Sequence, residues 1–245
     1  PNTTLSKSSL GEDITNTKIY SKLRISELSQ QYGHIEGKPG VTTNTGIVRE
    51  PDILISTSLG DASTDGINLL KSELGYSGSN AEILKNFAQD MVDEYLDVFE
   101  SIKYYDGFYI GRYELTGTKE NPTVQRDMTI LTETIANSWY GLKNACNRVV
   151  NGDDKDAQSY MIYGNQWDEV MDWLVDTEAK TDSEVNIDSS TWGNYSDSSG
   201  VAKVEGAGSL QDSGHSDAWS ANNIYDLAGN YYDFTQEASN STHRV

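Results

Sequence analysis

The stretch NNIYDLAGNYYDFTQE, residues 222–237, restricts the fold of this chain more than any other segment. Two aromatic-rich halves flank Gly229 and Asn230, and Asp226 and Asp233 stand seven residues apart. A helix, a hairpin, a metal-binding loop or a wall of a binding site would each account for part of this pattern. A helix is disfavoured because Gly229 and Asn230 interrupt the apolar pattern at its centre. We therefore expect a turn that leads into a core strand formed by YYDFT.

The two aspartates of this stretch are candidates for a calcium site. Calcium binds several oxygens from carboxylates and backbone carbonyls at close quarters. Asp226 and Asp233 can supply side chains from the two ends of a tight turn, and carbonyls near Gly229 and Tyr231 can point inward. The alternative is a turn whose aspartates are merely solvated, and the residues alone leave both alternatives open.

The charge of the chain excludes some classes of partner. The 245 residues include 38 acidic and 18 basic side chains, a formal net charge of −20. Nucleic acid and an anionic membrane surface would both be repelled, so neither is expected as a partner. The 15 tyrosines and 5 tryptophans, against 4 phenylalanines, supply rings that suit either a recognition surface or a tyrosine-rich core.

Cysteine and histidine offer little chemistry in this sequence. Cys146 is the only cysteine, so neither an intrachain disulfide nor a cysteine-rich zinc site can form. It lies on the apolar face of a predicted helix, where we expect it to be buried and inert. His34, His215 and His243 stand in polar segments without ligand spacing, and we expect them to be solvated.

Helical periodicity is clearest in SNAEILKNFAQDMVDEYLDVFESIKYY. Ser79 or Asn80 can cap the start of this helix, with Glu82 in its first turn. Apolar residues spaced by three or four draw one stripe along it, namely Ile83, Phe87, Met91, Tyr95, Phe99 and Ile102. A turn at Asp106–Gly107 then leads into a predicted strand over 108–113.

Two further helices and a long loop are predicted after residue 113. The first helix spans about 129–149 and the second follows Gly164, with Asn165 as its cap and Asp168 in the capping-box position. Residues 177–220 lack periodicity and indicate either functional surface or disorder. Their aromatic residues argue against disorder, namely Trp192, Tyr195 and Trp219.

No catalytic motif stands out in the sequence. It lacks a GxSxG nucleophile elbow, a P-loop, a GxGxxG dinucleotide motif and an HExxH metal motif. Carboxylate pairs carry no specificity among 38 acids, so they do not indicate a glycosidase. We expect a protein that is not an enzyme.

Three segments, taken in order, resemble one family. YDGFYIGRYELTG, MIYGNQWDEVMDWL and NNIYDLAGNYYDFTQEA are similar to the early strand, the middle strand-to-helix segment and the late Gly-Asn motif of formylglycine-generating-enzyme-like proteins. The resemblance covers about residues 105–245. It implies an α+β, loop-rich, C-type-lectin-like fold of the formylglycine-generating-enzyme type. The family's Arg-Gly-Gly segment does not follow the last motif, so we expect a C-terminally incomplete domain over 51–245, preceded by a polar extension over 1–50.

The resemblance also implies a cofactor. In the family the Gly-Asn motif helps to form a calcium site, which here would use the side chains of Asp226 and Asp233 and the carbonyls of Gly229 and Tyr231. Asp233 replaces the family's usual glutamate and has a shorter reach. Catalytic members bind copper through a late cysteine pair, and iron-binding relatives use histidines. This chain has no cysteine after Cys146, and the histidines of the iron-binding relatives are not evident either, so we expect neither copper nor iron.

Similar non-catalytic proteins of bacteria and prophages bind ligands. They include variable proteins of diversity-generating retroelements and surface proteins with a pilin-like N-terminal segment. We therefore expect a receptor- or glycan-recognition domain on a bacterial surface, a pilus or a phage particle, without direct membrane contact by this segment. The late loops supply the candidate contacts, namely Trp192, Tyr195, Trp219, Tyr231 and Tyr232. Each is also a plausible core residue, Tyr232 most of all, because it alternates with Tyr231 and one of the two must face inward. The alternatives are a metal-dependent oxidoreductase of the same family and a structural subunit that self-assembles.

Overall fold

The computed structural model describes residues 64–132, 138–150, 157–236, 238–240 and 243–244. The chain divides into two compact units, one formed by Pro1–Tyr109 with Gln236–Val245 and the other by Ile110–Thr235. We describe each unit by itself. The boundary expected near residue 50 lies outside the described residues.

The long helix of the first unit confirms its sequence prediction. Helix α5 spans Asn80–Tyr105 and is capped by Ser79. The Ser79 hydroxyl accepts a hydrogen bond from the Glu82 amide at 3.4 Å, and the Glu82 carboxylate accepts one from the Ser79 amide at 2.9 Å. This capping box satisfies two amides that lack partners inside the helix. The helix ends at Asp106, which adopts the left-handed conformation with φ 60°.

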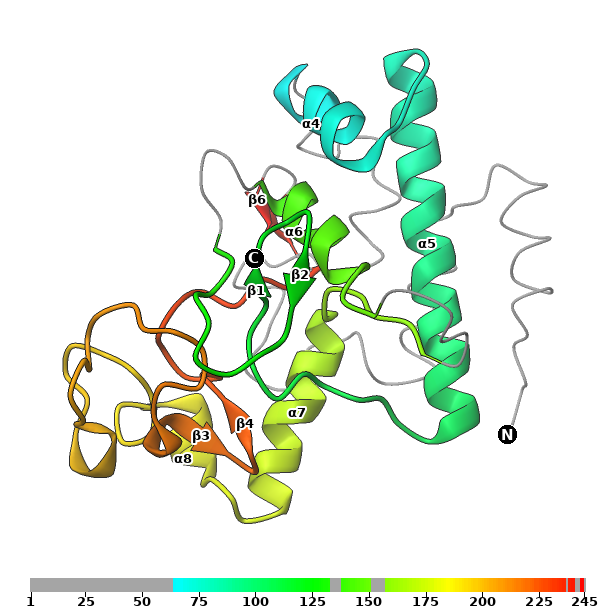
Figure 1. Ribbon diagram of the computed structural model, residues 1–245. Coiled ribbons are helices and arrows are strands. Elements are labelled where there is room, and N and C mark those ends of the chain that lie inside the picture. The colour runs from blue at the N-terminus through cyan, green and yellow to red at the C-terminus, as the bar shows by residue number, and fades with distance from the viewer. Residues whose placement is uncertain (1–63, 133–137, 151–156, 237, 241–242, 245) are drawn as a thin grey trace. The chain divides into compact units, whose positions relative to one another are not determined.

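Helix α4, which spans Thr64–Leu74, lies beside α5 (Figure 1). The stripe residues Ile83, Phe87, Met91 and Tyr95 are buried, as predicted. Tyr76 meets Phe87 edge to face at 6.0 Å and donates a hydrogen bond of 2.5 Å to Asp90. The same unit contains the antiparallel pair of β5, Ala238–Asn240, with β6, His243–Arg244. The buried Gln236 ties this C-terminal segment to α5 by donating to Glu94 at 2.8 Å.

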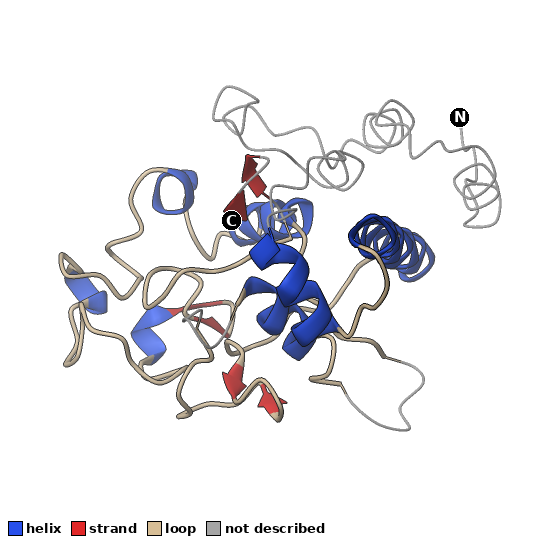
Figure 2. Cartoon of the chain, turned by 90° about the horizontal axis from the view of Figure 1, so that it is seen from above, coloured by secondary structure: helices blue, strands red, loops and turns tan. Residues whose placement is uncertain are grey.

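The second unit has short elements joined by long loops (Figure 2). Its helices are α6, Trp139–Cys146; α7, Gly164–Asp176; α8, Asp182–Asn186; and the 3₁₀ turns η3, Gly200–Ala202, and η4, Asp217–Trp219. Its two antiparallel hairpins pair β1, Thr116–Gly117, with β2, Pro122–Thr123, and β3, Ser220–Ala221, with β4, Ile224–Tyr225. The molecule therefore mixes helices with small antiparallel sheets, while its C-type-lectin-like identity stays a prediction.

The strand predicted over 108–113 was wrong. Residues 108–115, all described, contain a bend at 112–113 and no strand. Phe108 and Ile110 are half-buried, whereas Tyr109 between them is fully exposed. The alternation in the sequence was real, but the segment makes only isolated backbone contacts, such as the 2.9 Å bond from the Tyr225 amide to the Arg112 carbonyl.

The helix predicted over 129–149 was too long. Only Trp139–Cys146 forms α6, and residues 133–137 lie outside the described residues. Ile130 instead forms an antiparallel bridge with Thr116, and the Leu131 amide bonds to the Leu115 carbonyl at 2.7 Å. Cys146 at the end of α6 is half-buried, where full burial was expected.

Helix α7 begins at Gly164, so its N-cap lies two residues before the predicted one. Its N-cap is Tyr163, not Asn165, and the residue in the capping-box position is Gln166, not Asp168. The Gln166 side chain accepts a 3.2 Å hydrogen bond from the Tyr163 amide, which replaces the expected aspartate contact. Val170 and Leu174 of the predicted stripe are buried, while Trp167 and Met171 are half-buried.

The loops after α7 are organised by buried side chains. Leu174, Trp192, Ala221 and Ala228 form one hydrophobic cluster, and each buried indole is hydrogen-bonded to a backbone carbonyl. Trp192 donates to Glu184 at 3.1 Å and Trp219 donates to Ala202 at 2.9 Å. Pairing of the indole N–H removes the main penalty for burying tryptophan.

Gly229 allows two loops of this unit to touch. The Asn194 amide bonds to the Ala228 carbonyl at 2.9 Å, and the Asn230 amide bonds to the Asn194 carbonyl at 3.0 Å. Gly229 between them has φ 74°, and a Cβ built there would lie 2.3 Å from the Asn194 carbonyl oxygen. Only glycine satisfies both the left-handed backbone and this approach.

We predict that Gly229→Ala will destabilise the protein much more than Gly200→Ala. Gly200 also has a positive φ, 56°, but no atom lies within 4 Å of its built Cβ. The control should therefore cost about 1–2 kcal/mol of backbone strain, whereas Gly229→Ala adds a clash with backbone and should cost about 3 kcal/mol or more. Chemical denaturation of both variants measures the difference, and equal losses would contradict the role of close approach.

Candidate functional site

Asp226 stands at the centre of the candidate site. Its side chain is completely buried, and its backbone is left-handed with φ 62°. One carboxylate oxygen, Oδ2, accepts hydrogen bonds from the Gly214 amide at 2.7 Å and from the Ser213 hydroxyl at 3.2 Å. The other oxygen, Oδ1, is buried without a hydrogen-bond partner. A buried carboxylate oxygen without a donor or cation is costly, so a proton or a cation at Oδ1 would be favourable.

Ser213 connects this aspartate to two other segments. It is fully buried, and its hydroxyl accepts a 3.0 Å hydrogen bond from the Glu114 amide while it donates to Asp226. Its backbone amide bonds to the Met128 carbonyl at 2.9 Å, and its carbonyl accepts from the Asp127 amide at 2.8 Å. Three loops that are distant in sequence therefore meet at one serine.

Three carboxyl groups lie near one another at this junction. Burial, together with the nearby charges of Asp233 and Asp226, raises the pKa of Glu114 to about 9. Burial also raises the pKa of Asp233 to about 7, with Asp226 as a second cause, although Asp233 as a whole residue is only half-buried. Burial raises the pKa of Asp226 against the lowering effect of its donors Gly214 and Ser213. Glu114 resembles Asp226 in having a buried oxygen, Oε1, without a hydrogen-bond partner.

The structure does not bring all four predicted calcium ligands together. Asp226 and Asp233 share the carboxylate cluster, whereas the Gly229 carbonyl accepts a 2.8 Å hydrogen bond from the Tyr231 amide inside the turn. Within the described residues, no group of three or more His, Cys, Asp or Glu side chains is arranged to hold a metal ion. Sequence reasoning missed Glu114, whose signal was an acid between Tyr113 and Leu115.

Two of the predicted ligand contacts are core residues. Trp192 is 2% exposed and Trp219 is 0% exposed, so neither indole is available to a ligand in this structure. Both were candidate contacts with a core position as the alternative, and the structure places them in the core. Tyr195 is half-buried, and its hydroxyl shares a 2.8 Å hydrogen bond with Ser189.

The remaining two candidates, Tyr231 and Tyr232, lie in the segment predicted as a core strand, and that prediction was wrong. Residues 231–235 are described and form no strand. Tyr232 was the more plausible core residue of the pair, but it is 81% exposed, while Tyr231 is half-buried. The two rings meet edge to face at 5.7 Å. The turn at Gly229 bends the chain so that Tyr232 points to solvent.

A second pair of side chains fixes the loop before this turn. Asn194 and Asn230 are hydrogen-bonded to each other at 2.9 Å. Asn194 also accepts from the Gly208 amide at 2.7 Å and donates to the Ser209 carbonyl at 2.8 Å. Asn230 accepts from the Gln211 amide at 2.9 Å. Side-chain amides thus replace a sheet in holding residues 208–211.

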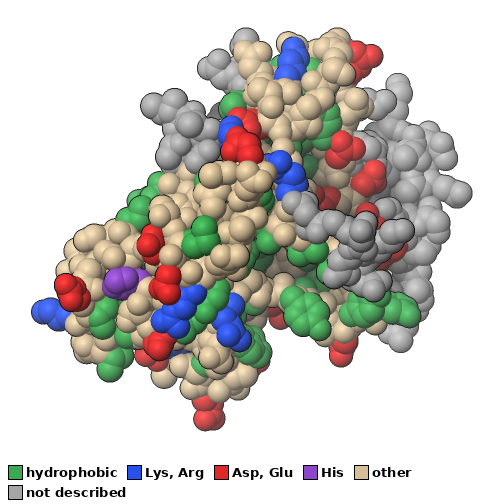
Figure 3. Space-filling model, viewed as in Figure 1, with side chains coloured by type: hydrophobic (Ala, Val, Ile, Leu, Met, Phe, Trp, Pro, Cys, Tyr) green, Lys and Arg blue, Asp and Glu red, His purple; other side chains and the backbone are tan. Residues whose placement is uncertain are grey.

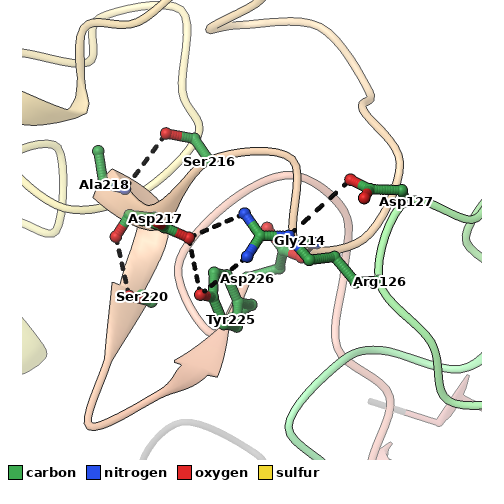
Figure 4. Close-up of polar contacts among 9 residues, drawn as sticks. All are labelled: Arg126, Asp127, Gly214, Ser216, Asp217, Ala218, Ser220, Tyr225 and Asp226. Carbon is green, nitrogen blue, oxygen red and sulfur yellow. Dashed lines mark hydrogen bonds and ion pairs between the residues drawn. The ribbon is translucent and has the colours of Figure 1, made fainter.

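A charged and aromatic cluster lies on the surface next to Gly214 (Figure 4). Arg126 donates to Asp217 at 2.8 Å, and Tyr225 donates to the same carboxylate oxygen at 2.7 Å. The Arg126 guanidinium also lies over the Tyr225 ring at 5.2 Å, and Tyr113 stacks on that ring at 5.1 Å. On the face drawn in Figure 3, Lys and Arg side chains appear among Asp and Glu side chains. Sequence reasoning did not single out this cluster, because its members are distant in sequence.

The raised carboxyl pKa values predict a pH-dependent stability. The folded state keeps protons on Glu114 and Asp233 that the unfolded state releases near pH 4. The stability that these two carboxyls contribute is therefore fully present below about pH 4 and is lost as pH rises toward about 7 for Asp233 and about 9 for Glu114. Without added divalent cations, Glu114→Gln should reduce the decline in unfolding free energy between pH 5 and 9 by up to about 1.4 kcal/mol per pH unit. Urea denaturation across this range tests it. Glu120→Gln, at an exposed acid, should leave the slope unchanged.

Comparison with known proteins adds no assignment. No family model, no curated protein and no solved structure matches the chain. None of the helices among the described residues is long and apolar enough to cross a membrane.

Proposed function

We propose that the chain carries a non-catalytic, ligand-binding domain with a C-type-lectin-like fold of the formylglycine-generating-enzyme type. The domain recognises a protein or glycan and is displayed on a bacterial surface, a pilus or a phage particle. The proposal rests on one observation: side-chain hydrogen bonds and buried indoles hold the long loops of residues 177–235 in place. Binding residues are frequently carried by loops that a rigid scaffold positions.

The exposed tyrosine after the Gly-Asn turn supports this proposal. Tyr232 is 81% exposed and follows a turn that is fixed by Gly229 and Asn230. A rigid, exposed ring brings contact area with little loss of rotamer freedom on binding. Tyr231 touches it edge to face, so the two form a small aromatic surface. The proposed recognition face is therefore Tyr231 and Tyr232, with Tyr195 beside the same loop system.

Charge supports a ligand that is not a polyanion. A net charge of −20 repels nucleic acid and anionic polymers, whereas a neutral glycan or a basic protein surface is accepted. Display outside the cell rests on the resemblance described above.

We also propose calcium as the cofactor of this domain. The support is the junction of Asp226, Asp233 and Glu114, where two buried carboxylate oxygens lack hydrogen-bond partners. Calcium accepts carboxylates mixed with backbone and amide oxygens, so it does not need three converging acids. Bound calcium would hold the loops of residues 114, 226 and 233 together.

Calcium should stabilise the protein through this junction. Thermal unfolding in EDTA and in calcium at about 100 times its dissociation constant should differ by about 2.7 kcal/mol. Glu114→Gln and Asp226→Asn should each lose most of this gain because they remove a cluster carboxylate. Asp197→Asn, at an exposed acid, is the matched control and should keep it. An equal response of all four proteins would rule out the junction as the site.

The ligand proposal is tested by binding to arrays of glycans and of surface proteins. The wild-type domain should retain at least one ligand, and Tyr232→Ala should weaken it at least tenfold, as expected for an aromatic residue central to an interface. Ile187→Ala removes another exposed apolar side chain, 79% exposed, and should have little effect. Arrays without any bound ligand would overturn the proposal.

The same preparation separates the two alternatives. Concentration-dependent assembly without a ligand would indicate a structural subunit. Stoichiometric copper or iron in the purified protein would indicate an oxidoreductase. Either result, together with blank arrays, would replace the proposed function.

A further inference from the structure

The surface cluster of Arg126, Asp217 and Tyr225 presents hydrogen-bonding groups that the protein itself does not use. A guanidinium carries five N–H donors. Arg126 uses one in the 2.8 Å bond to Asp217 and makes one long contact of 3.5 Å to the Tyr225 hydroxyl, and its Nε lies 3.9 Å from Asp127. Its side chain is 39% exposed, so the remaining donors can reach a ligand.

Asp217 offers acceptors beside these donors. Its side chain is 76% exposed, and both of its bonds, from Arg126 and Tyr225, go to the single oxygen Oδ1. The other oxygen is available to a donor from solvent or from a ligand. A donor group and an acceptor group thus stand a hydrogen-bond length apart on the surface (Figure 4).

The groups are held in place before any ligand arrives. The Tyr225 ring carries the guanidinium on it and is itself stacked on Tyr113. Gly214 lies under both, because a Cβ built there would come within 2.8 Å of Tyr113 and 3.0 Å of Arg126. Tyr225 also belongs to the β3–β4 hairpin, and Asp217 to the η4 turn. Such support lowers the entropy lost on binding.

The local charge selects the class of ligand. Arg126 is accompanied by Asp217 and Asp127, so the cluster is not cationic, and the whole chain carries a charge of −20. An anion would be repelled by this surface. Adjacent hydroxyls of a sugar ring each donate and accept, and they are spaced to meet a carboxylate and a guanidinium that are already paired.

We propose that Arg126 and Asp217 form a binding site for a neutral glycan, with two adjacent sugar hydroxyls hydrogen-bonded to the two side chains. This inference rests on the proposed function, since it names a ligand class for a binding domain, but it assigns that ligand to side chains other than Tyr232.

The test is an NMR titration of the ¹⁵N-labelled chain with the methyl glycosides of glucose, galactose, mannose and N-acetylglucosamine. At least one neutral glycoside should shift the amides of residues 214–217 and 126–127, and glucuronate should not. Arg126→Gln should weaken binding at least about tenfold, as expected for loss of hydrogen bonds to a charged group. Arg126→Lys keeps the charge without the planar fork and should also bind more weakly. Lys203→Gln, at an exposed lysine, makes the same charge change as Arg126→Gln and should bind normally.

The outcomes separate this site from the general function. No amide shift with any glycoside, or unchanged binding by both Arg126 variants, would overturn the inference. If the arrays still retain a ligand that depends on Tyr232, the proposed function stands while this site does not. If the glycosides bind the wild-type chain and no longer bind Arg126→Lys, while that variant keeps a native spectrum, the site stands. This holds whatever the arrays retain.

Discussion

The hydrogen bonds of Asp226 to Gly214 and Ser213 are the interaction on which the second unit depends. This aspartate is fully buried, and its Oδ2 joins the turn at 226 to the segment at 213–214. Ser213 extends the connection to the amide of Glu114 and to the backbone at 127–128. Hydrogen bonds to an ionised group are stronger than neutral ones, and they are stronger still in a buried setting. The strands among the described residues of this unit have two residues each, so these side-chain contacts hold together segments that a larger sheet would otherwise join.

The same arrangement brings several carboxyl groups together, which makes its stability depend on protons or on a bound cation. Asp226 shares its surroundings with Glu114 and Asp233, so charge accumulates where water is scarce. Either protons or a cation must offset that charge, because an isolated buried carboxylate is strongly disfavoured. Protons neutralise the group but weaken it as an acceptor for Gly214, whereas a cation leaves Oδ2 charged. The calcium that we propose would offset this charge and leave the bond to Gly214 at full strength.

Local signals explain which parts of the fold the sequence predicts. Helix α5 combines a capping box at Ser79 with an unbroken apolar stripe, and both act within a few residues. The helical spacing predicted over 129–149 begins at Leu131, but the Leu131 amide bonds to the Leu115 carbonyl, next to the bridge between Thr116 and Ile130. Trp219 stands in a polar segment and is nevertheless buried, because the carbonyl of Ala202 pairs its indole. The sequence indicated Asp226 and Asp233 because they flank Gly229 and Asn230. Glu114 is distant from them in sequence and comes near them only in the folded chain.

Gly214 relates the buried junction to the surface cluster. Its amide donates to Asp226, and the space left by its missing side chain is filled by Tyr113 and Arg126. The position of Arg126 over Tyr225 thus depends on the same short segment that Asp226 holds. Loss of charge on Asp226 weakens the bond to Gly214 and loosens this support. A cation at the buried carboxylates would consequently order the Arg126–Asp217 pair without touching it, so occupancy of the inner site and recognition at the outer surface become thermodynamically linked.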